Sequence, residues 1–195
     1  MNGKPITIVS GLPRSGTSLM MGMLHAGGME LLTDGIRTAD ADNPKGYYEF
    51  ERVKQIEHDQ DWLEDAGDKA VKMIAELLRH LPQDYTYKVI FMRRQMDEIL
   101  ASQRQMMIRR GEPTDRVSDD EIATMFNRHL ERVEAWIAEQ PNMDVLYVSY
   151  NDLLVEPAQH VRTINEFLGG TLDENRMTGV VDPSLYRQRT ESAAR

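Results

Sequence analysis

The strongest constraint on the fold is the alternation of short apolar runs with helical patterns along the chain. The partly continuous apolar residues of these runs are typical of strands that are covered on both faces. The four runs are Ile6–Leu12, Lys69–Ile74, Tyr87–Met92 and Val145–Tyr150. Strands that alternate with helices favour a parallel sheet with helices on both sides. The sequence therefore predicts an α/β fold with a central parallel sheet flanked by helices, as a single domain over residues 1–195.

Apolar residues at helical spacing predict the helices. The predicted segments are residues 19–24, 96–107, 122–137 and 157–168, the last of which ends at a pair of glycines. The clearest of them begins with Ser118 and Glu121, a capping box in which each side chain satisfies a free backbone amide. Its apolar stripe includes Met125 and His129, so we expect both to pack in the core. The polar segment 34–65 is expected to be a loop followed by a helix that begins near Glu49.

Composition excludes several classes of function. The chain has no cysteine, which excludes disulfides and thiolate metal sites, and none of its five histidines pair at zinc-ligand spacing. The net charge of −9 is unfavourable for non-specific binding to nucleic acid or to a membrane surface. No apolar stretch approaches the roughly 20 residues of a membrane-spanning helix. We therefore expect a cytoplasmic protein without a metal ion, a nucleic-acid partner or a membrane anchor.

The segment between the first predicted strand and helix has the layout of a phosphate-binding loop. Gly11 and Gly16 permit tight turns, and hydroxyl groups and backbone amides beside the helix N-terminus point toward one spot. A Walker loop would place lysine directly after Gly16, where this chain has Thr17, and the cation instead lies inside the loop at Arg14. No clear acidic partner for Mg²⁺ follows a later strand. The sequence predicts a phosphate cradle that is not an NTPase site, with an ordinary glycine-containing turn as the alternative.

The motif PRSGTSL resembles the 5′-phosphosulfate loop of sulfotransferases that use 3′-phosphoadenosine 5′-phosphosulfate (PAPS). This resemblance implies the P-loop NTPase-like form of the three-layer fold and adenosine 3′,5′-bisphosphate (PAP) as the product. It implies that the 5′-phosphate is held by Arg14, Ser15, Gly16, Thr17 and Ser18, and that Arg14 also reaches the bridging oxygen.

A second, independent signature follows the third predicted strand. Arg94 comes at the end of this strand, and Ser102 follows eight residues later. The resemblance implies that Arg94 and Ser102 bind the donor's 3′-phosphate, although Met96 stands where the family often has proline. Arg93 is an alternative ligand, and a solvated arginine pair that caps the strand is the other interpretation.

The resemblance extends over nearly the whole chain, because the segment 145–156 and the helix that ends near Leu168 are also similar to the family. In the family, a late basic segment often covers the 3′-phosphate. Arg187 and Arg189 are therefore further candidates for donor binding, with a solvated tail as the alternative.

Sulfuryl transfer needs a base for the acceptor's proton and cations that stabilise charge on the leaving phosphate. We assign the cationic role to Arg14, with Lys72 at the end of the second predicted strand as a helper. Glu49 is our candidate for the base, because it follows a turn with two aromatic residues that suits an acceptor pocket. Its alternative role is that of a carboxylate in the first turn of a helix. Lesser candidates for the base are His25, Asp34 and His58.

The sequence thus indicates an enzyme that transfers a sulfuryl group from PAPS to a hydroxyl or amine of a small acceptor, without a metal ion. Residues 33–49 and 111–118 are expected to shape the acceptor pocket. One alternative is a P-loop small-molecule kinase that uses ATP, and a Mg²⁺ requirement would favour it. The other is a non-catalytic nucleotide-binding regulatory protein.

Overall fold

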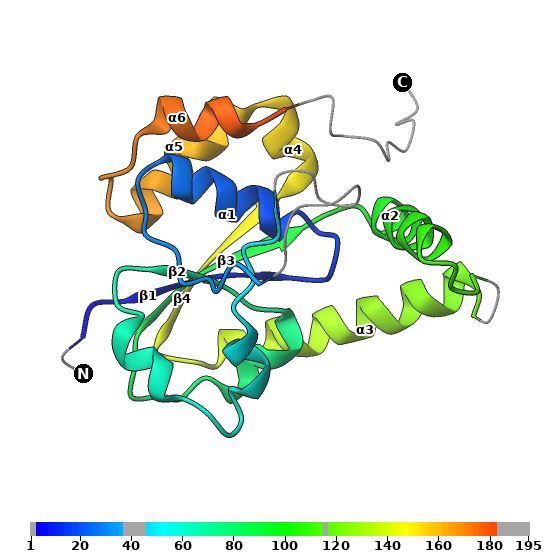
Figure 1. Cartoon of the computed structure of the whole chain (residues 1–195), viewed down its shortest axis with the longest axis horizontal. Coiled ribbons are helices and arrows are strands. Elements are labelled where there is room, and N and C mark those ends of the chain that lie inside the picture. Colours follow the sequence, from blue (N-terminus) through cyan, green and yellow to red (C-terminus); the bar gives the residue numbers. More distant parts are fainter. Residues whose placement is uncertain (1–2, 37–45, 115–116, 183–195) are drawn as a thin grey trace.

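The computed structural model describes residues 3–36, 46–114 and 117–182. Within these residues, the centre of the fold is a parallel sheet with the strand order β2-β1-β3-β4 (Figure 1). The strands are β1 Ile6–Gly11, β2 Ala70–Lys72, β3 Tyr87–Arg93 and β4 Met143–Ser149. The predicted parallel sheet is therefore confirmed. The second strand is shorter than predicted, since Ile74 is already the N-cap residue of the following 3₁₀ helix and is 49% exposed.

The helices lie between and after the strands. The α-helices of the described residues are α1 Thr17–Ala26, α2 Met96–Arg109, α3 Asp119–Ala138, α4 Tyr150–Val155, α5 Pro157–Leu168 and α6 Glu174–Val180. Short 3₁₀ helices are η1 Glu51–Gln55, η2 Asp61–Asp65 and η3 Ala75–His80. Glu49 precedes the N-cap residue Phe50 of η1, so it is not a first-turn helix carboxylate as its alternative interpretation required.

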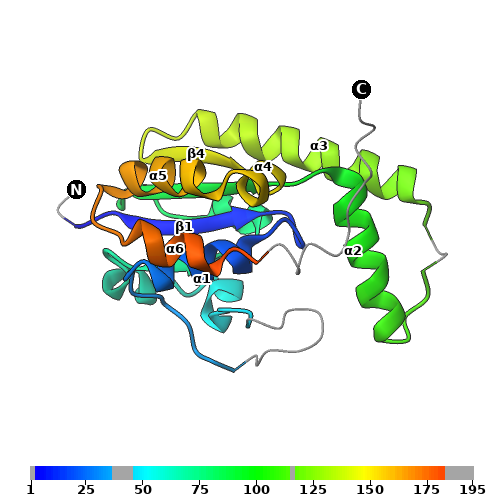
Figure 2. The same cartoon turned by 90° about the horizontal axis from the view of Figure 1, so that it is seen from above.

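Two hydrophobic cores lie on opposite faces of the sheet. Helices α1, α4, α5 and α6 cover one face, and the 3₁₀ helices with the end of α3 cover the other (Figures 1 and 2). Side chains alternate between the two cores along each strand, as Ile8 and Val9 do on β1 and Phe91 and Met92 do on β3. All four are at most 1% exposed. Burial on both faces explains why the sequences of the strands are nearly continuous runs of apolar residues.

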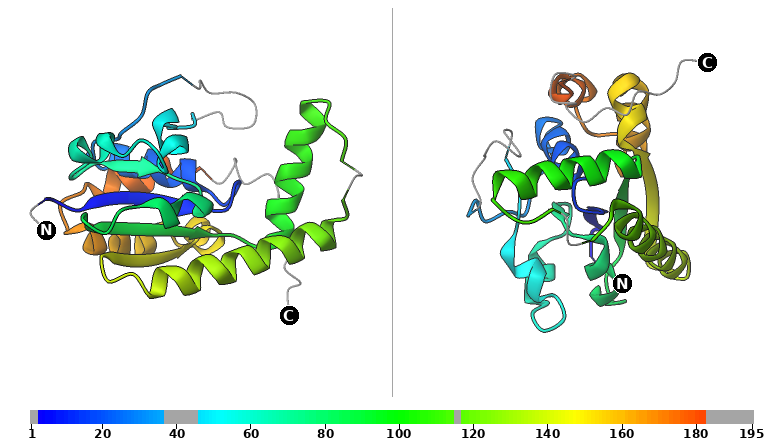
Figure 3. Two further views of the ribbon diagram at one scale, coloured as in Figure 1. Left: turned by 90° about the horizontal axis from the view of Figure 1, so that it is seen from below. Right: turned by 90° about the vertical axis from the view of Figure 1, so that its right-hand side faces the viewer.

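Helix α3 corrects one prediction. Its capping box at Ser118 and Glu121 is present, but only the C-terminal part of its apolar stripe packs on the core. Met125 is 57% exposed, and Nδ1 of the partly exposed His129 lies 3.2 Å from a carboxylate oxygen of Glu76 instead of packing in the interior. The physical reason is that the N-terminal half of α3 extends beyond the edge of the sheet toward α2 (Figure 3).

The carboxyl ends of the strands meet at one edge of the sheet. Gly11 pairs with Met92 across β1 and β3, so the loop after β1 lies beside the point where the chain enters α2. Lys72 ends β2 on the other side of β1. In parallel sheets this edge is where ligands bind, and the predicted site residues on β1, β2 and β3 lead to it.

Candidate active site

The loop between β1 and α1 is shaped by two glycines with positive φ. Gly11 has φ +146°, and a Cβ atom there would lie 2.6 Å from the carbonyl oxygen of Met92 on β3. Gly16 has φ +101° and is the N-cap residue of α1 without a side-chain capping bond. These glycines let the loop lie against β3 and leave the amides at the start of α1 without a side-chain cap, as an anion cradle requires.

Ser15 places a buried hydroxyl group in this loop. The residue is 1% exposed, and its Oγ has no hydrogen-bond partner within the part of the chain that the structure describes. A buried hydroxyl without a partner is costly, because it loses its bonds to water. A phosphate oxygen in the loop would supply the missing acceptor, so the residues present fit a phosphate group.

The ring of Tyr150 supports the same loop from α4. A Cβ atom at Gly16 would lie 2.3 Å from Cδ2 of this ring, so the ring lies directly against the loop backbone. Burial raises the pKa of the Tyr150 phenol, while the charge of Arg94 opposes that rise. The phenol is therefore neutral near pH 7. The sequence pattern placed Tyr150 at the end of a strand, whereas it begins α4 after the capping residue Ser149.

Gly16→Ala is expected to destabilise the protein more than Gly28→Ala does. Gly28 has a similar φ of +99°, but a Cβ atom there would meet no atom of the described residues within 4 Å. Both variants strain the backbone by about 1–2 kcal/mol. Contact with Tyr150 adds overpacking of about 1–3 kcal/mol in Gly16→Ala. Urea denaturation measures the difference in the free energy of unfolding, and equal losses in the two variants would contradict the close contact.

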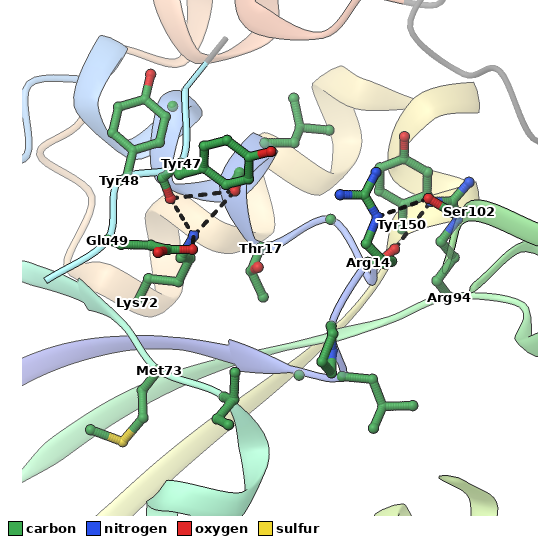
Figure 4. Close-up of a pocket in the computed structure, with 18 of the residues that line it drawn as sticks. Arg14, Thr17, Tyr47, Tyr48, Glu49, Lys72, Met73, Arg94, Ser102 and Tyr150 are labelled. Atoms are coloured by element: carbon green, nitrogen blue, oxygen red, sulfur yellow. Dashed lines mark hydrogen bonds and ion pairs between the residues drawn. The ribbon is translucent and has the colours of Figure 1, made fainter. Parts of the chain in front are cut away.

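The two sequence signatures meet at one point. Nε of Arg14 donates a 2.9 Å hydrogen bond to Oγ of Ser102 on α2. Arg14 also accepts a hydrogen bond: a terminal nitrogen of Arg94 donates a 3.1 Å bond to its carbonyl oxygen. Figure 4 shows all three side chains together beside Tyr150. The loop motif and the Arg94–Ser102 pair are thus parts of a single site.

Two members of this cluster were missed as site residues in the sequence. Glu98 forms a 2.9 Å ion pair with Nε of Arg94, and the Arg94 guanidinium lies 4.5 Å from the ring centroid of Tyr150. The i,i+4 spacing of Arg94 and Glu98 was a signal for this pair. The sequence contained no comparable signal for the contact of Tyr150 with Gly16.

Arg93 points away from the site. Its guanidinium forms hydrogen bonds of 3.0 and 2.6 Å with Glu134 on α3 and lies 4.1 Å from the ring centroid of Tyr147. Successive residues at the end of a strand face opposite sides. Of the two arginines, Arg94 is therefore the one that lines the site.

A second cluster surrounds Lys72 at the end of β2. Its ammonium group donates to the carbonyl oxygen of Tyr47 and, at 3.4 Å, to Oγ of Ser18. Oε1 of Glu49 lies 3.5 Å from the same nitrogen, and the side chains of Lys72 and Glu49 are only 13% and 21% exposed. Figure 4 shows this cluster on the opposite side of Thr17 from Arg14. Lys72, and not Arg14, is therefore the cation beside the candidate base.

The backbone before Glu49 has an unusual conformation. Tyr48 has φ +51°, a left-handed conformation that non-glycine residues seldom adopt. Strain of this kind is found mainly where a site requires it. Here the turn lets the carbonyl oxygen of Tyr47 and the carboxylate of Glu49 both approach Lys72.

A cleft of about 880 Å³ contains both clusters. One face of α2 lines it through residues spaced three and four apart, namely Ser102, Gln105, Met106 and Arg109. Near Lys72 the lining is mainly aromatic and aliphatic, and includes Tyr47, Tyr48, Phe50, Met73, Ile74 and Leu77. The cleft therefore combines a cationic part at Arg14 and Arg94 with a more apolar part beside Glu49.

The lesser candidates have different positions. His25 lines the cleft, whereas Asp34 and His58 do not. The Asp34 carboxylate accepts a bond from the backbone amide of Glu51, and His58 is exposed. Arg187 and Arg189 lie outside the described residues, as do parts of both predicted acceptor loops.

Comparisons with known proteins agree with this fold. The model of the sulfotransferase family matches residues 37–174. The sulfotransferase domain from the olefin synthase of Synechococcus PCC 7002 aligns with a TM-score of 0.57 at 18% identity, over 99% of this chain and 90% of that domain. A sulfotransferase from Mycobacterium tuberculosis aligns with a TM-score of 0.60 at 18% identity, over 91% of this chain and 70% of that protein.

A mouse sulfotransferase complexed with PAP aligns with a TM-score of 0.57 at 16% identity, over 91% of this chain. The alignment covers 62% of the mouse protein, so this chain spans less than two thirds of its length. A comparison with curated proteins finds no match. Within the described residues, no helix combines the length and the hydropathy needed to cross a membrane, and no three histidine, aspartate or glutamate side chains group as metal ligands.

Proposed function

The chain belongs to the sulfotransferase family, and we propose that PAPS is the donor of the sulfuryl group that this enzyme transfers to a small acceptor. The 2.9 Å hydrogen bond between Arg14 and Ser102 carries this proposal. It joins the phosphate loop to the Arg94–Ser102 pair. A donor with phosphate groups at both the 3′ and the 5′ position of its ribose needs two such sites in one cleft. The mouse sulfotransferase of the same fold is complexed with PAP, the product that PAPS leaves.

We assign the 5′-phosphosulfate to the loop. Ser15 offers a buried hydroxyl without a partner among the described residues, and Thr17 and Ser18 offer hydroxyls at the first turn of α1. Gly16 lets the backbone approach the ligand closely. Arg14 retains its assigned role, because a guanidinium has five N–H donors and its Nε bond to Ser102 is compatible with donation to an anion.

We assign the 3′-phosphate to Arg94 and Ser102. A guanidinium matches a phosphate because its planar fork donates paired hydrogen bonds. Both residues line the cleft, and Ser102 is held in place through its bond from Arg14.

Glu49 and Lys72 are the proposed catalytic pair. PAPS, when bound, supplies the sulfuryl group. Glu49 accepts the proton that the acceptor hydroxyl or amine loses, and Lys72 donates hydrogen bonds that stabilise negative charge on the leaving phosphate together with Arg14. The 3.5 Å separation of Lys72 and Glu49, and the contact of Lys72 with Ser18 of the loop, support these roles.

The apolar lining beside Glu49 supports an acceptor with a mainly aromatic or aliphatic body. Phe50, Met73 and Leu77 contribute to this lining. A nucleophilic hydroxyl or amine on such a body could approach the carboxylate while the body displaces water from the cleft. The cytoplasmic location and the organisation as one domain over residues 1–195 remain predictions.

Calorimetric titration with PAP in metal-free buffer tests the donor site. We expect micromolar binding, and we expect Arg94→Gln to weaken it by about 10- to 100-fold, because a hydrogen bond to a charged group contributes about 1.5–3 kcal/mol. Arg93→Gln is the matched control, since the adjacent arginine contacts Glu134 instead of the cleft. Tight binding of ATP with Mg²⁺ and none of PAP would contradict the proposal in favour of a kinase.

A further inference from the structure

Glu98 is the most deeply buried charged residue among the described ones, with 1% of the residue exposed. It lies in the first turn of α2, one turn before Ser102. A buried carboxylate is strongly unfavourable unless it is paired and hydrogen-bonded. A buried carboxylate beside the proposed donor site must therefore have a partner there.

The carboxylate of Glu98 holds the guanidinium of Arg94. Oε2 accepts the 2.9 Å bond from Nε, and the side chain of Arg94 is only 8% exposed. The ring of Tyr150 lies against the guanidinium at 4.5 Å from the ring centroid. A long flexible side chain is thereby fixed in one orientation before any ligand arrives.

The orientation of Arg94 also determines a contact with the phosphate loop. A terminal nitrogen of Arg94 donates to the carbonyl oxygen of Arg14, a residue with φ +71°. That backbone conformation is unfavourable for a non-glycine residue, so the hydrogen bond from Arg94 to the Arg14 carbonyl oxygen helps to maintain it. Arg14 in turn donates to Ser102. Glu98 is thus connected through Arg94 to both phosphate sites.

We propose that Glu98 is a positioning residue for donor binding, which acts through Arg94 on both the 3′-phosphate site and the phosphate loop. This inference rests on the proposed function, because it concerns the same donor. Glu98 itself does not line the cleft. Its effect on the affinity for a nucleotide therefore requires Arg94.

Glu98→Gln tests the proposal by calorimetric titration with PAP and with 5′-AMP, which lacks the 3′-phosphate. We expect the variant to bind PAP about tenfold more weakly or worse and 5′-AMP about threefold more weakly, because the fixed orientation of Arg94 supports both sites. Glu134→Gln is the matched control, since it makes the same charge change at the Arg93 pair. Circular dichroism at the titration temperature establishes that each variant is folded.

A double-mutant cycle separates positioning from a structural role. In the background of Arg94→Gln, Glu98→Gln is expected to change the PAP affinity by less than about twofold, since Arg94 carries its effect. Additive losses, or an unchanged affinity for either nucleotide in Glu98→Gln alone, would overturn the inference. If Glu98→Gln does not fold, Glu98→Asp keeps the charge but shortens the side chain, and affinities equal to those of the wild type would overturn the inference. Failure of the wild-type protein to bind PAP would instead refute the proposed function.

Discussion

Glu49→Gln is expected to lower kcat by about 10²- to 10⁴-fold, the usual contribution of a general base. Glutamine keeps the size of the side chain but cannot accept the acceptor's proton. The affinity for PAP should be nearly unchanged, because the proposed donor site at the loop, Arg94 and Ser102 lies on the other side of the cleft. The measurement is PAP release from PAPS, with the best acceptor from a panel of phenols and aliphatic alcohols.

Glu51→Gln is the control for this variant. Glu51 lies two residues along the chain and forms an ion pair of 2.7 Å with Lys54 on the surface, so we expect its loss to leave kcat unchanged. A Glu49→Gln variant that retains full turnover would exclude Glu49 as the base. His25, which also lines the cleft, would then be the next residue to test.

Lys72→Met is expected to lower kcat by about 10²- to 10³-fold, as the loss of one preorganised donor to developing charge does in other enzymes. Methionine has a similar length but no charge and no N–H donor. The variant also loses the bonds to Ser18 and to the Tyr47 carbonyl oxygen, which join the loop to the segment that carries Glu49. The same PAP-release assay measures the effect, and PAP titration separates turnover from binding.

Lys88→Met provides the matched control. Lys88 is a partly buried lysine on β3 whose ammonium group contacts the carbonyl oxygen and the ring of Phe167, away from the cleft. We expect this variant to keep its kcat. If Lys72→Met weakened PAP binding but left kcat unchanged, Lys72 would be a binding residue and its proposed catalytic role would be wrong.

Glu49 and Lys72 should also act as a unit. Their 3.5 Å contact means that each variant leaves the remaining partner in a partly buried place without its counter-charge. Effects on kcat of residues that act together are strongly non-additive. The double variant is therefore expected to lose little more activity than the more impaired single variant.

The sequence alone determined the features that depend on local geometry. The two glycines and the hydroxyls of residues 15, 17 and 18 predicted a cradle at the start of a helix, and the apolar spacing over residues 96–107 predicted the helix that carries Ser102. The alternation of buried runs with helical patterns predicted the parallel sheet. The loop, the helices and the individual strands are readable because each involves residues close together in the sequence, whose relative positions the backbone largely dictates.

Only the tertiary structure decided which distant residues meet. Lys72 lies beside Ser18 because β2 pairs with β1, and no local pattern gives the strand order. The packing of α2 and α3 against the sheet places Arg94 beside the loop and Arg93 beside α3. It also buries Glu98 and leaves Met125 exposed where α3 extends beyond the sheet. Hydrophobic periodicity shows that one face of a helix is apolar. Which element covers that face depends on the packing of the whole chain. Contacts between residues tens of positions apart are therefore set by sheet order and helix placement.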